Sequence, residues 1–374
     1  MIYLNNAATS FPKFKETSTA IYEALLKGNT EYKRSSVAND NVERIIFDLR
    51  EKISSMLHAE KPHYICFTNN DTMAINFLIM GYCGLNKGDI ILTDKYVHNS
   101  VSRPLIQLEQ NRGVKIVYIE NLNDIKNVIN KYSSKIKFAI FSHGSNVTGD
   151  VLPLEEIGKI LKDNNIHLIV DVAQTFGAID INVEKMNISA LTFAGHKLLV
   201  GPQGTGGFYI RKKFPIKPIV FGGTGNSSME LNPQVVFPDS FEVGTPAIHD
   251  LIGLFASLRV ITEVIGEKKY AEKLRDISVY AYKELQNVPN IILYGNEKKE
   301  LPVISFNIKG YSAMQIGQIL AQNDIVCRTG VHCASKAIEQ LNVIKEYGGT
   351  VRVSFGWFTT KTEIDSLIKI LKNI

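Results

Sequence analysis

Phe193-Ala194-Gly195-His196-Lys197 is the segment that says most about the architecture of this chain, and a glycine-rich turn follows it at residues 201–207. Lysine side chains are normally exposed to water. Lys197, however, directly follows an apolar run with the composition of a buried strand. An earlier apolar run, residues 167–170, ends on the carboxylate of Asp171. We therefore expect a site with an amine and a carboxylate at the ends of two buried strands.

This pair of groups has a specific chemical use. An amine held in place bonds covalently to an aldehyde, and a carboxylate favours the protonated form of a nearby pyridine nitrogen. Pyridoxal 5'-phosphate (PLP) carries both an aldehyde and a pyridine nitrogen, and a protein that uses it supplies these two partners. Lys197 and Asp171 therefore predict PLP as the cofactor.

The middle of the chain alternates short β-rich runs with helical patterns. Such alternation predicts an α/β fold with a largely parallel sheet and helices on both of its faces. After residue 255 a long helical region leads into a further mixture of strands and helices, which predicts a smaller α+β domain. The strands expected in the sheet are residues 63–68, 89–93, 115–119, 138–142, 166–172, 190–194 and 207–211.

Composition excludes several classes of protein. The 374 residues predict about two domains, and 45% apolar with 21% charged residues is typical of a folded protein. The net charge of +5 comes without a dense Lys/Arg cluster, so no nucleic-acid partner is expected. The N-terminus does not resemble a signal peptide, and no apolar stretch approaches about twenty residues, so no membrane partner is expected. The four cysteines form no C-x-x-C pair, which predicts no metal site and a cytoplasmic location with reduced thiols.

A phosphate site is expected where residues 67–72 lead from a strand into an apolar helix. Backbone N–H groups at the start of a helix attract anions, and the Thr72 hydroxyl adds a donor. Taken alone, the same residues are explained better by an ordinary helix cap formed by Asn70 or Asp71. A second glycine-rich turn, residues 221–225, lets the backbone approach a ligand closely. The chain has no G-x-x-x-x-G-K-[ST] motif, which argues against a nucleotide.

Short motifs in a specific order extend over nearly the whole chain, at residues 3–9, 72–76, 98–100, 145–149, 171–174, 195–197, 241–246, 328–334 and 352–354. In this order and spacing the chain resembles the class V aminotransferase-fold enzymes, and among them the cysteine desulfurases. The resemblance implies a fold type I PLP-dependent transferase whose large domain holds a mostly parallel seven-stranded sheet. It places the large domain at residues 15–255. Residues 1–14 and 256–374 would form the small α+β domain.

The resemblance also implies roles in binding the cofactor. Lys197 would bond to the cofactor aldehyde and move the Cα proton of the substrate, while Asp171 would contact the pyridine nitrogen. Gln174 resembles the residue that hydrogen-bonds the ring hydroxyl oxygen. His98 resembles the histidine that stacks on the ring, and a histidine there is also suited to proton transfer.

The phosphate contacts are likewise implied by the resemblance. Thr72 and His196 match phosphate-binding positions. Gly223 and Thr245 resemble positions that reach the phosphate in the neighbouring subunit, which implies a homodimer. Asp71 falls among the cofactor-binding positions, where many relatives have a small neutral residue. Its charge would repel a phosphate, so we expect its side chain to point away or to cap the helix.

Cys333 decides the expected reaction. Arg328 and His332 are cationic or potentially cationic neighbours, and such surroundings favour the nucleophilic thiolate. The resemblance implies that Cys333 takes sulfur from L-cysteine as a persulfide, releases L-alanine and passes the sulfur to an acceptor protein or thiol. Asn146 and Arg352 resemble the groups that bind the substrate carboxylate, and Arg328 is a further candidate for that contact.

Two other functions are compatible with these residues. The first keeps the cofactor but changes the substrate, as in a selenocysteine lyase or another class V lyase or aminotransferase. The second is a non-enzymatic sulfur carrier that uses Cys333 alone, although Lys197 and Asp171 argue against it. Two departures from the resemblance affect the details: Ala194 stands where relatives commonly have Ser or Thr, and Val331 replaces a frequent histidine.

Overall fold

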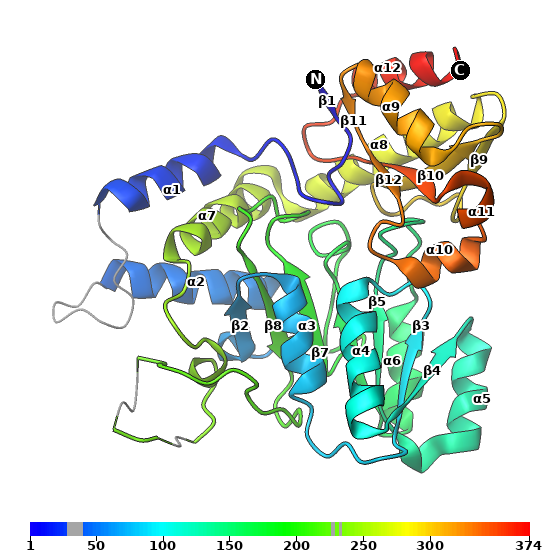
Figure 1. The fold of residues 1–374 in the computed structure, drawn as a ribbon. Coiled ribbons are helices and arrows are strands. Elements are labelled where there is room, and N and C mark those ends of the chain that lie inside the picture. Colours follow the sequence, from blue (N-terminus) through cyan, green and yellow to red (C-terminus); the bar gives the residue numbers. More distant parts are fainter. Residues whose placement is uncertain (28–39, 226–228, 232–233) are drawn as a thin grey trace.

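The computed structural model describes residues 1–27, 40–225, 229–231 and 234–374. A seven-stranded sheet lies at the centre of the larger part of the chain, in the order β2-β8-β7-β6-β5-β3-β4 (Figure 1). Strand β8 runs antiparallel to both of its neighbours, and the other neighbouring strands run parallel. The strands are β2 (Ile65–Thr68), β3 (Ile90–Asp94), β4 (Lys115–Ile119), β5 (Ile136–Ser142), β6 (His167–Asp171), β7 (Ala190–Ala194) and β8 (Gly206–Ile210).

The predicted α/β fold with a mostly parallel seven-stranded sheet is confirmed. Each expected strand is present, with ends shifted by a few residues at most. The strand expected at residues 138–142 begins two residues earlier, at Ile136, and the one expected at residues 63–68 begins two residues later, at Ile65. Pro62–Tyr64 forms a 3₁₀ turn there, because proline fixes a backbone angle that suits the start of a helical turn.

Both faces of the sheet are buried, because alternate side chains of each strand point to opposite sides. In β5, Phe138 and Ile140 join the apolar cluster under α3 and α4. Ala139 and Phe141 join the cluster under the helices of the other face. The helices of this larger part are α1 (Lys15–Lys27), α2 (Asp40–Met56), α3 (Asp71–Met80), α4 (Asn99–Arg112), α5 (Leu122–Tyr132), α6 (Leu154–Asp163) and α7 (Ile248–Arg259).

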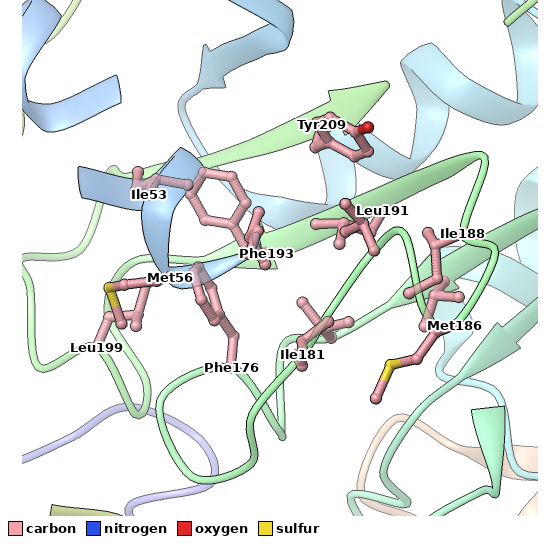
Figure 2. Close-up of a cluster of buried hydrophobic side chains, with 14 of the residues drawn as sticks. Ile53, Met56, Phe176, Ile181, Met186, Ile188, Leu191, Phe193, Leu199 and Tyr209 are labelled. Carbon is pink, nitrogen blue, oxygen red and sulfur yellow. The ribbon is translucent and has the colours of Figure 1, made fainter. Parts of the chain in front are cut away.

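Aromatic and aliphatic side chains fix the strand that precedes the lysine turn. Phe193 of β7 is fully buried and contacts Phe176 edge to face, with ring centroids 5.8 Å apart. Figure 2 shows Ile53 and Met56 of α2 in the same cluster. Burial of side chains of this size stabilises the fold by about 1.5–3 kcal/mol each. The end of β7 is therefore held in a fixed position.

The smaller part contains a four-stranded antiparallel sheet, β12-β13-β10-β9, and a parallel pair formed by β1 and β11. Its apolar cluster lies between these strands and helices α8, α9 and α12. The strands are β1 (Ile2–Tyr3), β9 (Ile291–Leu293), β10 (Val303–Ile308), β11 (Ile325–Val326), β12 (Arg328–Gly330) and β13 (Thr350–Ser354). The helices are α8 (Glu267–Gln286), α9 (Ala313–Gln322), α10 (Ser335–Leu341), α11 (Ile344–Tyr347) and α12 (Lys361–Leu371).

The N-terminal segment begins in the smaller part of the structure and continues onto the larger part. β1 pairs with β11, and α1 packs against α7 on the larger part (Figure 1). Residue 255, the expected domain boundary, lies inside α7, and a π-helical turn, Val260–Ile265, continues this helix toward α8. The division into two domains at that residue stays a prediction. No helix in the described part of the chain is long and apolar enough to cross a membrane.

Candidate functional site

The lysine predicted from the sequence lies in a turn after β7, at the edge where the parallel strands end. Gly195 is required in this turn, because a Cβ atom there would lie 2.2 Å from the Thr205 hydroxyl oxygen. Burial lowers the pKa of Lys197 from its ordinary value, whereas the nearby carboxylates of Asp171 and Asp71 act to raise it. Ligands of open α/β sheets bind at the carboxyl ends of the strands, where this amine lies.

Asp171 ends β6, the strand next to β7, and is buried. Its Oδ1 accepts a hydrogen bond from the Ala173 N–H at 2.9 Å, and its Oδ2 accepts one from the Ser142 hydroxyl at 3.2 Å. These donors fix the orientation of the carboxylate. Gln174 is one turn further on, and its Nε2 donates to the Ala7 carbonyl at 3.0 Å. The structure brings Lys197 and Asp171 together, and the contacts of both residues with the cofactor stay predictions.

His98 caps the start of α4 and belongs to the same site. Its Nδ1 accepts from the Ser100 N–H at 3.1 Å, which places the ring proton on Nε2. Burial, and then the positive charge of Lys197, lower the pKa of His98 to about 4, against the opposing effect of Asp171. His98 is therefore neutral at pH 7. A neutral ring is suited to lie against an aromatic cofactor and to accept a proton only briefly.

The structure shows which of the two candidate residues, Asn70 or Asp71, caps the start of α3. Asn70 is its N-cap, since the Asn70 side chain accepts from the Met73 N–H at 2.9 Å. Asp71 therefore does not cap the helix, and the expectation that its side chain points away from the phosphate stays a prediction. Asp71 Oδ1 is buried without a hydrogen-bond partner, and its carboxyl interacts electrostatically with Asp171 and Lys197. The cap site is already taken by Asn70, so the next side chain turns inward.

His196, predicted to contact a phosphate, is held by its backbone. Its carbonyl oxygen accepts from the Lys13 ammonium at 3.0 Å and from the Thr9 hydroxyl at 3.2 Å. Ser10 adds its N–H and its hydroxyl, each at 3.0 Å. The His196 Nδ1 atom is buried without a partner. The N-terminal segment thus holds the backbone of the residue before Lys197 by hydrogen bonds. Burial lowers the pKa of the Lys13 side chain to about 8.

The hydrogen bonds from the N-terminal segment to the His196 carbonyl were not predicted from the sequence. Lys13 and His196 are 183 residues apart in the chain. No local pattern marks Lys13 as different from the other lysines. The motif at residues 3–9 indicates that the segment matters, but only the tertiary structure shows what it contacts.

The smaller part of the structure contributes two arginines from neighbouring strands. Arg328 of β12 lies directly opposite Arg352 of β13. Arg352 is 1% exposed and donates to the Asn146 carbonyl at 2.9 Å and to Asn5 Oδ1 at 3.2 Å, while its Nε is buried without a partner. Burial, followed by the charge of Arg328, lowers the pKa of Arg352 to about 9. Two cations side by side form a site for an anion.

Arg328 makes a contact that the sequence did not predict, and its candidate role at the substrate carboxylate stays a prediction. Its Nη2 donates to Cys333 Sγ at 2.8 Å. Both Arg328 and Arg352 also act electrostatically on Lys197. The thiol from the smaller part of the structure and the lysine from the larger part therefore share one site.

Cys333 lies in a strained turn. His332 and Cys333 both have positive φ angles, 51° and 58°, which cost non-glycine residues about 1–3 kcal/mol each. Hydrogen bonds hold the turn in place. His332 Nε2 lies 2.8 Å from the Thr350 hydroxyl, Asn146 Nδ2 donates to the His332 carbonyl at 2.8 Å, and the Asn99 N–H donates to the Cys333 carbonyl at 2.8 Å. Asn146 thus positions the cysteine turn and Arg352 together.

Gly223 and Thr245 both lie at the surface. Thr245, Asn69 and Met73 line one hollow of about 200 Å³ beside the start of α3. The structure thus places Thr245 close to the expected phosphate site without bringing it to Lys197. Among the described residues there is no cluster of three or more side chains suited to bind a metal ion.

Comparison with known proteins identifies the class. The Aminotransferase class-V family profile matches residues 2–367, and the chain belongs to this family. Curated relatives that match the whole chain include proteins named cysteine desulfurase. The "Probable cysteine desulfurase" of Pyrococcus abyssi is 30% identical, over 100% of this chain and 94% of the relative. The resemblance inferred from the sequence is therefore confirmed.

Solved structures agree with this assignment. The apo structure of a cysteine desulfurase from Thermococcus onnurineus NA1 has a TM-score of 0.90 at 30% identity, and the match covers 100% of this chain and 94% of that one. A C-DES variant with glycine covalently linked to its PLP cofactor shares the fold, with a TM-score of 0.84 at 21% identity. That match covers 100% of this chain and 96% of the other.

Proposed function

We propose that this protein is a PLP-dependent cysteine desulfurase that converts L-cysteine to L-alanine and takes the sulfur onto Cys333 as a persulfide. The observation that carries the proposal is the contact between Arg328 and the Cys333 thiol at 2.8 Å, in a site that also holds Lys197. A cysteine close to the lysine is needed for sulfur transfer, and transamination alone does not need it. The relatives named cysteine desulfurase support the same reaction.

The residues of this site fit the cofactor. Lys197 has an amine of lowered pKa beside Asp171, as a reactive amine and a pyridine partner require. Two buried polar atoms without partners, His196 Nδ1 and Arg352 Nε, are suited to ligand contacts. When bound, PLP supplies an electron sink for charge that develops on the substrate. Lys197 would hold its aldehyde carbon, and the first turn of α3 would hold its phosphate.

The chain's own residues then perform the sulfur transfer. Arg352 would bind the substrate carboxylate and Lys197 would carry the Cα proton. The Cys333 sulfur attacks the substrate sulfur, so a new S–S bond forms and the substrate Cβ–S bond breaks. The electron pair of the broken bond stays with the three-carbon fragment, which takes up a proton and leaves as L-alanine. Cys333 is left as a persulfide, and an acceptor thiol removes the outer sulfur.

We further propose that the protein acts in the cytoplasm as a homodimer. All four cysteines are free thiols, as expected in a reducing compartment. Exposed apolar side chains gather in the segment that follows Val220, and such groups are typical of interaction surfaces. They are Phe221, Met229, Leu231, Val235 and Val236. A partner subunit on this segment would lie next to Gly223 and Thr245, and sedimentation of the holoenzyme at twice the monomer mass is the expected result.

The reaction is tested with L-cysteine as substrate. The wild-type holoenzyme should release L-alanine and carry a persulfide on Cys333, as detected by mass spectrometry after alkylation. Cys333→Ser should bind PLP normally but release no alanine, whereas Cys83→Ser, a matched change of another partly exposed thiol, should retain activity. Full-rate desulfuration by Cys333→Ser would exclude the proposed nucleophile. Faster turnover of L-selenocysteine than of L-cysteine would indicate a selenocysteine lyase instead.

A further inference from the structure

Asn5 belongs to the motif at residues 3–9, to which the proposed reaction assigns no role. Its side-chain oxygen, Oδ1, accepts a hydrogen bond from Arg352 Nη2 at 3.2 Å. The backbone of Asn5 lies beside β13, the strand that carries Arg352, where it forms an isolated parallel bridge with Ser354. The Ser354 N–H also donates to the Leu4 carbonyl at 2.8 Å. The N-terminal segment therefore presents the Asn5 amide to the guanidinium in a fixed position.

Arg352 is a buried cation whose hydrogen-bond partners are neutral. Its side chain donates to the Asn146 carbonyl and to the Asn5 amide oxygen, and its Nε is buried without a partner. After burial, the groups that affect the pKa of Arg352 are the like charge of Arg328, two cysteine thiols and one tyrosine hydroxyl. None of these groups is a carboxylate. A buried charge without a counter-ion is costly, so the folded site lacks one negative charge beside this guanidinium.

The neutral charge of Asn5 decides whether the charge of Arg352 stays available. Asparagine and aspartate have nearly the same shape, and either side chain can accept the hydrogen bond from the guanidinium. An aspartate at this position would also supply the missing counter-ion in the free protein. A substrate carboxylate would then meet a neutralised guanidinium and a second anion, which repels it. The amide, in contrast, orients the guanidinium and leaves its charge to a ligand.

We propose that Asn5 is a positioning residue that determines specificity for substrates with a carboxylate, because it orients Arg352 and, being neutral, leaves the guanidinium charge to the substrate. The proposal rests on the proposed role of Arg352 at the substrate carboxylate and is independent of sulfur transfer. It predicts that Asn5→Asp stabilises the free protein and at the same time weakens the binding of carboxylates. A residue that only supports the fold would not change these two properties in opposite directions.

The test compares L-alanine with ethylamine, which has the same amine and carbon chain but no carboxylate. Binding of each amine to the holoenzyme is followed by the change in cofactor absorbance, and the wild type should prefer L-alanine. In Asn5→Asp this preference should fall by about tenfold or more, because a contact between charged groups is lost. The melting temperature of the same variant without amine should rise. Asn127→Asp adds the same charge on the exposed face of α5 and should leave the preference unchanged.

Other outcomes overturn the proposal. A wild type that binds both amines equally well excludes a carboxylate site at Arg352, and a preference that persists in Asn5→Asp excludes the role of Asn5 alone. An Asn5→Asp protein that melts at a lower temperature, or does not fold, shows that Arg352 lacks no counter-ion.

Asn5→Ala separates charge from geometry, because it removes the hydrogen bond without adding a charge. It should lower the melting temperature and reduce the preference for L-alanine less than Asn5→Asp does. An equal reduction in both variants would assign the effect to geometry and overturn the role of the neutral charge. Neither amine contains sulfur, so a failure of the desulfurase assay is distinguished from a failure of this proposal.

Discussion

Replacement of Arg352 by lysine tests the substrate-binding half of the site most directly. Arginine has five N–H donors in a rigid fork, whereas a lysine ammonium has three. Two donors of Arg352 bond Asn146 and Asn5 in the folded protein, and its Nε is buried without a partner. In Arg352→Lys the ammonium can replace these two structural bonds and still offer one donor to the substrate. The two-point contact with a carboxylate is lost.

The size of the effect follows from one lost hydrogen bond between charged groups. Such a bond contributes about 1.5–3 kcal/mol, and each 1.4 kcal/mol corresponds to a factor of ten. We therefore expect Arg352→Lys to bind L-cysteine about 10- to 150-fold more weakly. Binding of cysteamine, which has the same amine and thiol but no carboxylate, should change little.

The assay follows the change in cofactor absorbance as each amine is added to the holoenzyme. Arg259→Lys serves as the control, because Arg259 is exposed on α7 and, among the described residues, its ion pair is with Glu263. It should leave both dissociation constants unchanged. An Arg352→Lys enzyme that still prefers L-cysteine to cysteamine by the wild-type factor would refute the assignment of Arg352 to the carboxylate.

Two further predictions concern stability. Glu242 forms a buried ion pair with Arg50 and accepts from the Phe67 N–H at 2.7 Å, so Glu242→Ala should lower the free energy of unfolding by about 3–5 kcal/mol in urea. Glu120→Ala, which breaks the exposed pair with Lys95, should cost less than about 1 kcal/mol, and equal losses would contradict the argument. Lys13 has a folded-state pKa of about 8, below its ordinary value, so the unfolded chain binds more protons above pH 8. The melting temperature of the wild type relative to Lys13→Met should therefore rise between pH 8 and 10, and a constant or falling difference would exclude the lowered pKa.

Much of the fold follows from local sequence. A continuous run of apolar residues, as in β5, places apolar side chains on both faces of a strand and therefore indicates a sheet that is buried on both faces. Phe138 and Phe141 lie in the apolar clusters on the two opposite faces. The glycine of the lysine turn and the carboxylate that ends β6 mark the edge of the sheet where ligands bind. These signals are local, because strand period and turn geometry depend on neighbouring residues. Lys197 and Asp171 could therefore be paired from the sequence.

Other parts of the site depend on packing between distant segments. The same run of residues allowed Asn70 or Asp71 to cap α3, and only the packed structure shows that Asn70 does so while Asp71 turns toward Lys197. Arg328 was a further candidate for the substrate carboxylate, which stays a prediction, and the register of β12 with β13 also brings it to Cys333. Register is set by the pairing of whole strands and cannot be derived from one motif.

The sequence by itself determined where the strands of the large sheet lie along the chain and which turn carries Lys197. Tertiary structure alone decided which charges meet. It placed Lys13 on the His196 carbonyl and joined Arg328 to Cys333. It also buried the Asp71 carboxyl beside another acid. The physical reason is that backbone conformation follows from adjacent residues, whereas burial and electrostatic interaction depend on distances across the folded chain.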